Sequence, residues 1–131
     1  QCFLLYLLIL LLIILSGCNN DSKDKNIDES TLTYVGEGDY WKATYIINST
    51  GDKTYGSLDI KLKDLDSATG IVEYALFKNG IKTTYGTGNI GSEIGGTGGG
   101  TGPKPEKSDE YSIELKWNEG KDQETLQLEL E

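Results

Sequence analysis

The sequence predicts an all-β fold, an immunoglobulin-like antiparallel β-sandwich of about seven strands in residues 32–131. Three observations lead to this prediction. Apolar and polar residues alternate in several stretches, turn-forming residues separate these stretches, and no sustained apolar period of 3.6 appears after residue 31. Two packed sheets let short strands each bury one face, and a small barrel is the second architecture that this pattern allows.

Period-two alternation predicts the individual strands. It occurs in YWKATYIIN (40–48), SLDIKLK (57–63), YSIELKW (111–117) and TLQLELE (125–131). Such alternation is typical of strands with one buried and one solvated face, so Trp41, Tyr45, Tyr111 and Trp117 are expected in the core. The stretch GIVEYALF (70–77) is apolar at both alternating sets of positions and predicts a strand that is either more central in the sheet or covered on both sides.

Turn-forming residues separate these stretches. Residues 49–53 (STGDK) and 118–123 (NEGKDQ) each lie between two predicted strands. Asn79-Gly80 is a strong hairpin signal because both residues tolerate a positive φ angle.

The segment 86–102 contains nine glycines in seventeen residues. We expect a long mobile loop or a frayed edge strand, ending at Pro103 and Pro105. A binding loop is the functional alternative, in which Ile90 and Ile94 either attach the loop to the domain or contact a ligand. The segment also contains a G-x-G-x-x-G pattern, but no helix can start in the glycine-rich sequence that follows, so nucleotide binding is not expected.

The N-terminal part of the chain predicts an exported protein. Residues 3–15 (FLLYLLILLLIIL) are thirteen consecutive apolar residues without a charge. This length suits the helical core of a signal peptide, whereas a membrane-spanning helix needs about 20 such residues. An uncleaved anchor helix remains the alternative. The small residues Ser16 and Gly17 then precede Cys18.

The sequence LSGC, from Leu15 to Cys18, resembles the lipobox of bacterial lipoproteins. The resemblance implies that signal peptidase II recognises Leu15, Ser16 and Gly17 and cleaves before Cys18, whose sulfur carries a diacylglyceryl group. Residues 1–17 would then be the signal peptide, and residues 18–31 the lipidated cysteine with a polar, flexible tether. Membrane lipid would hold the chain through Cys18 on the extracytoplasmic side of the cell membrane.

Several stretches of the mature chain are similar to small lipoproteins of Gram-positive bacteria with a single uncharacterised β domain. They are GEGDYWKATYIIN, GSLDIKLK, the glycine-rich segment and SIELKWNEGKDQETLQLEL. This resemblance implies a fold and a location, and it provides no catalytic residues.

Composition excludes several functions. The formal net charge of −9 disfavours nucleic acid as a partner. The chain has no histidine and no arginine, and a lipidated Cys18 could not act as a nucleophile or zinc ligand, so neither enzyme activity nor a cofactor is expected. Asp64 and Asp66 could contribute to a calcium site, but two carboxylates are too few alone, and turn capping is the expected role.

Four tyrosines are not placed by the strand pattern, namely Tyr34, Tyr40, Tyr55 and Tyr85. Exposed tyrosines can form a binding patch because they add contact area with little loss of entropy. We therefore expect a membrane-anchored, non-enzymatic binding module for a protein or glycan of the cell envelope. A lipoprotein that senses a small molecule or Ca²⁺ is the alternative.

Overall fold

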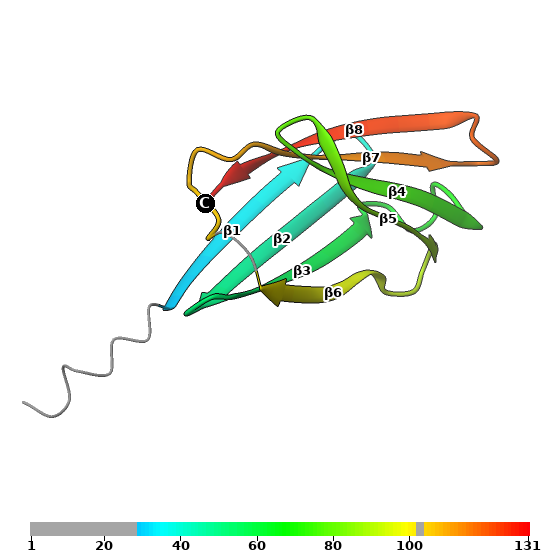
Figure 1. The fold of residues 1–131 in the computed structure, drawn as a ribbon. Helices are drawn as coiled ribbons and strands as arrows, with labels where there is room; N and C mark the ends of the chain where they lie inside the picture. Colours follow the sequence, from blue (N-terminus) through cyan, green and yellow to red (C-terminus); the bar gives the residue numbers. More distant parts are fainter. Residues whose placement is uncertain (1–28, 102–103) are drawn as a thin grey trace, which may run out of the picture.

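The computed structural model describes residues 29–101 and 104–131, and in these ranges the chain is all-β and antiparallel, as predicted (Figure 1). It has eight strands: β1 (Glu29–Glu37), β2 (Trp41–Thr50), β3 (Lys53–Leu62), β4 (Ile71–Lys78), β5 (Ile81–Asn89), β6 (Ile94–Thr101), β7 (Tyr111–Trp117) and β8 (Asp122–Leu130).

The strands form one hydrogen-bonded sheet in the order β5-β4-β7-β8-β1-β2-β3-β6. The sheet folds back where β8 meets β1, at the pairs Tyr34–Leu130 and Val35–Glu129, so β5-β4-β7-β8 lies over β1-β2-β3-β6 (Figure 1). The result is an almost closed, barrel-like sheet. The all-β class is therefore confirmed, but one continuous sheet of eight strands is not specifically the predicted immunoglobulin-like sandwich of about seven strands, and it lies closer to the second predicted architecture, a small barrel.

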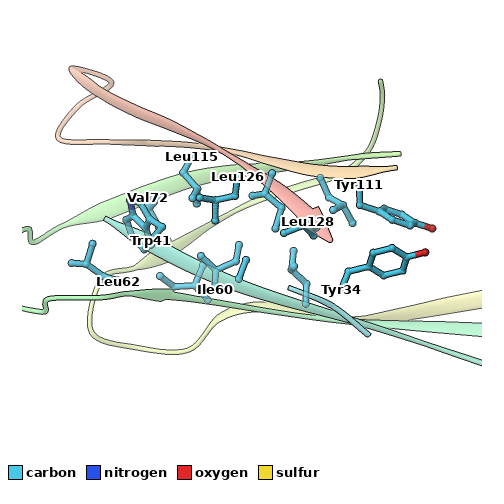
Figure 2. Close-up of a cluster of buried hydrophobic side chains, with 14 of the residues drawn as sticks. Tyr34, Trp41, Ile60, Leu62, Val72, Tyr111, Leu115, Leu126 and Leu128 are labelled. Atoms are coloured by element: carbon cyan, nitrogen blue, oxygen red, sulfur yellow. The ribbon is translucent and has the colours of Figure 1, made fainter. Parts of the chain in front are cut away.

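The core lies between the two layers (Figure 2). Trp41, Tyr111 and Trp117 are buried as predicted, and Tyr45 is partly buried against the core. The alternation fails to place Tyr34, which is also buried and whose ring centroid lies 4.8 Å from that of Tyr111 in the opposite layer. The aromatic rings in the core therefore connect the two halves of the sheet.

Of the two predictions for β4, the central position is confirmed and the covering of both faces is wrong. Its Val72 and Leu76 side chains face the core, whereas Ile71 is 60% exposed on the opposite face. β4 is nevertheless an internal strand, hydrogen-bonded to β5 and to β7. Its apolar outer positions therefore lie on the surface of the domain.

The domain begins earlier than the sequence pattern indicates. Glu29 pairs with Thr50 and Thr31 pairs with Asn48, so residues 29–31 belong to β1 and not to the predicted tether. The Thr31 hydroxyl also donates a hydrogen bond to Asn48 Oδ1 at 2.9 Å. The rest of the tether and the predicted signal peptide lie outside the described residues.

The glycine-rich segment is mostly strand and not one long loop. It contains the end of β5, a turn at residues 90–93, and all of β6. β6 pairs with β3 along its whole length, from Ile94–Ile60 to Thr101–Lys53. Backbone hydrogen bonding does not require side chains, so a neighbouring strand can hold a glycine-rich sequence extended. The edge-strand alternative is therefore the one that the structure shows.

The predicted turn at Asn79-Gly80 is confirmed, with φ angles of 51° and 82°. Asn79 also holds the segment before β7, because its Oδ1 accepts from Glu110 N at 2.8 Å and its Nδ2 donates to Asp109 Oδ1 at 3.1 Å. The backbone N–H of Glu106 donates to Asp109 Oδ2 at 3.0 Å, and this bond contributes most to lowering the pKa of Asp109 below its usual value. The ionised carboxylate thus fixes the approach to β7.

Candidate functional site

The two free edges of the sheet, β5 and β6, are consecutive in the chain and diverge from the turn that connects them (Figure 1). Ser92 N donates to Asn89 O at 3.0 Å within this turn, and Ile90 N donates to Gly70 O at 2.8 Å. Within the ranges that the structure describes, no backbone hydrogen bond joins β5 to β6. Each strand therefore presents one row of unpaired N–H and C=O groups.

A cleft of about 360 Å³ lies beside these edges, between the two layers of the sheet. It is lined by Tyr45, Gly56, Leu58, Tyr74, Leu76, Thr84, Gly96, Thr97, Gly98 and Gly99. The lining has aromatic, aliphatic and hydroxyl groups but no carboxylate and no amine. Such a surface suits a neutral or apolar group.

The cleft exists because β6 has almost no side chains on its inner face. Gly96 pairs with the buried Leu58, and Gly98 pairs with Gly56, so both glycines occupy inward positions. A Cβ atom added at either glycine would meet nothing within 4 Å. The interior that side chains fill elsewhere is therefore left open next to β6.

Two tyrosines narrow the cleft by packing over glycines. A Cβ atom at Gly56 would collide with the ring of Tyr45, and one at Gly86 would collide with the ring of Tyr74. Burial raises the pKa of Tyr45 above its usual value, so its hydroxyl remains protonated at neutral pH. The cleft thus contains neutral hydroxyl groups that can donate and accept hydrogen bonds.

The two isoleucines predicted for a binding loop, Ile90 and Ile94, lie where the chain passes from β5 to β6. Ile94 is 4% exposed and belongs to the core, and Ile90 is partly buried against the core. Their side chains attach the β5–β6 turn to the domain and leave little surface for a ligand. The other predicted site residues, Leu15, Ser16, Gly17 and Cys18, lie outside the described ranges.

Asp64 has the geometry of a turn cap. Its Oδ1 accepts from Asp66 N at 3.1 Å, and its carbonyl oxygen accepts from Ser67 N at 3.0 Å and from Ser67 Oγ at 2.6 Å. In the described part of the chain, no group of three or more Asp, Glu, His or Cys residues is placed to hold a metal ion. The contacts of Asp64 therefore give calcium binding no support.

Sequence reasoning missed Tyr74 and the inward glycines. The available signal was the period-two spacing of Gly96, Gly98 and Gly100 after Ile94, which is typical of a strand with one empty face. Only the pairing of β6 with β3 shows that this face points into the domain.

No helix among the residues that the structure describes is long and apolar enough to cross a membrane. Comparisons of the chain with protein-family models, with curated proteins and with solved structures found no match.

Proposed function

We propose that the chain is a lipid-anchored extracytoplasmic lipoprotein whose β domain binds an extended segment of another envelope protein, without enzymatic activity. The lipobox-like sequence ending at Cys18 supports the anchor. The observation that carries the binding function is the opening between β5 and β6, where two free strand edges lie beside an uncharged cleft.

An extended polypeptide is the ligand that satisfies a free strand edge. The unpaired N–H and C=O groups of β6 match the main chain of an added strand, which supplies affinity largely independent of sequence. The outward positions of β6 hold only glycine and threonine, from Gly95 to Thr101, so another backbone can approach closely.

The cleft then provides selectivity. Side chains of an added strand point alternately to the two faces of a sheet, so every second residue of the partner would point toward the domain interior. The open space over Gly96 and Gly98 can accept an apolar side chain there, against Leu58 and Leu76. A partner with alternating apolar residues is therefore favoured over a uniformly polar one.

The anchor is tested by intact-protein mass spectrometry of the chain purified from its bacterial host. We expect a mature N-terminus at Cys18 with a diacylglyceryl thioether, and we expect Cys18→Ser to release the protein from the membrane fraction. An unmodified thiol at this position, or an N-terminus elsewhere, would refute the anchor and leave the binding site of the domain unaffected.

Strand binding is tested by photo-crosslinking in the host. A benzoylphenylalanine at Thr97, beside the free edge of β6, should give a covalent adduct, whereas one at Thr125 on the outer face of β8 should not. Gly98→Val should abolish the adduct by filling the cleft, and valine suits an extended strand.

Gly100→Val is the matched control, because its Cβ also meets nothing within 4 Å and Gly100 does not line the cleft. We expect it to leave the adduct unchanged. Slower hydrogen exchange of the β6 amides in the complex would show that the partner adds as a strand. Equal crosslinking from Thr97 and Thr125, or full crosslinking in Gly98→Val, would contradict the proposal.

A further inference from the structure

A second hollow, of about 500 Å³, lies on the opposite, solvent-facing side of β4, β5 and β7. Its floor is Ala75, the small residue between larger neighbours on the outer face. The register places Tyr85 of β5 and Glu114 of β7 on either side of Ala75. Two strand spacings separate them, about 10 Å, and this gap suits a flat ring with its substituents.

The Tyr85 ring forms one wall of this hollow. It is 79% exposed, the most exposed of the large hydrophobic residues that the structure describes. Covering an exposed aromatic ring lowers the free energy, so Tyr85 can stabilise a bound ligand that has an apolar face.

Charged groups form the other walls. Glu73 of β4 lies opposite Lys116 of β7 in the strand register, and both residues line the hollow. Lys82 lines its other end, where its Nζ lies 6.0 Å from the centroid of the Phe77 ring. In the described ranges, no ion pair engages Glu73, Lys82, Glu114 or Lys116. Their polar atoms therefore remain available to donate and accept hydrogen bonds.

The charges of the hollow balance, although the chain carries a net charge of −9. Two carboxylates, Glu73 and Glu114, face two ammonium groups, Lys82 and Lys116. A balanced site gives no net attraction to an ion, so it favours a neutral ligand rich in hydroxyl groups. Glu114 is also oriented, because its Oε1 accepts from Gln123 Nε2 at 3.4 Å.

We propose that this hollow binds a neutral saccharide. A pyranose ring combines an apolar C–H face, which can stack on Tyr85, with hydroxyl groups that can donate to Glu114 and Glu73 and accept from Lys116. This site lies on the outer face of the layer, whereas the cleft lies between the two layers, and Tyr74 is the one residue that lines both.

The test is an NMR titration of the ¹⁵N-labelled full chain in phosphocholine micelles with cellotetraose and with an N-acetylglucosamine tetramer. We expect shifts confined to residues around Ala75, Tyr85 and Glu114 for at least one of these probes. Tyr85→Ala, and Ala75→Leu, which fills the floor, should each weaken binding about tenfold or more.

Tyr55→Ala is the matched control, since Tyr55 is also an exposed tyrosine, at 50%, but lies on β3. This variant and Gly98→Val should bind the saccharide as the unchanged chain does, which separates this site from the strand-binding cleft. The proposal is overturned if neither probe shifts these residues, if only the anionic tetragalacturonate does, or if Tyr85→Ala binds normally.

Discussion

Replacing Trp41 by alanine is expected to lower the free energy of unfolding by about 3–5 kcal/mol. Trp41 is 0% exposed, and its ring centroid lies 5.5 Å from that of Trp117 in the opposite layer. Removing the indole leaves a cavity between the layers that rigid strands can close only in part. Urea denaturation followed by far-UV circular dichroism measures the loss, and Trp117 provides a fluorescence signal in the variant.

Trp41→Phe is the control for this prediction. The indole Nε1 is buried and has no hydrogen-bond partner in the described structure, so phenylalanine removes an unsatisfied donor and keeps an aromatic ring. Its loss of stability should be clearly smaller than that of the alanine variant. A Trp41→Ala chain within about 1 kcal/mol of the unchanged protein would show that Trp41 does not hold the layers together.

Gly95→Ala is expected to lower the free energy of unfolding by about 1–3 kcal/mol or more. Gly95 has a φ angle of 121°, which side chains rarely tolerate, and an added Cβ would collide with the carbonyl oxygen of Leu58. β6 would have to move away from β3 to avoid this contact. The melting temperature should therefore fall by about 4–8 °C for each kcal/mol of stability lost, as measured by thermal unfolding.

The neighbouring Gly96 provides the matched control. It has no positive φ angle, and an added Cβ meets nothing within 4 Å. Gly96→Ala should be neutral or more stable by about 0.4–1 kcal/mol, because alanine reduces the entropy of the unfolded chain. Equal melting temperatures for the two variants would contradict the conformation assigned to Gly95.

Most strands could be predicted from the sequence because their burial follows chain alternation. In β7, Tyr111, Ile113, Leu115 and Trp117 are all buried, as their spacing indicates. Alternation does not predict burial where burial depends on a partner far away in the sequence. Ile71 and Tyr34 show this in opposite directions, since Ile71 is exposed on an apolar strand and Tyr34 packs on a tyrosine 77 positions further along the chain.

Only part of the candidate site could be predicted from the sequence. The glycine-rich segment indicates an unusual element, but its composition is equally compatible with a loop. Its conformation depends on β3, which supplies the hydrogen bonds that hold β6 extended. The tyrosines over Gly56 and Gly86 could not be assigned to the site, because their positions depend on the register of two separate strand pairs.

By itself the sequence determined the all-β class, the burial of Trp41, Tyr111 and Trp117, and the Asn79-Gly80 turn, because alternation and turn chemistry act between residues close in the chain. Only the tertiary structure decided that the sheet is continuous, that β5 and β6 are its two free edges, and that a cleft and an outer hollow lie near them. These features depend on which distant strands pair and in what register, and a local pattern does not encode that choice.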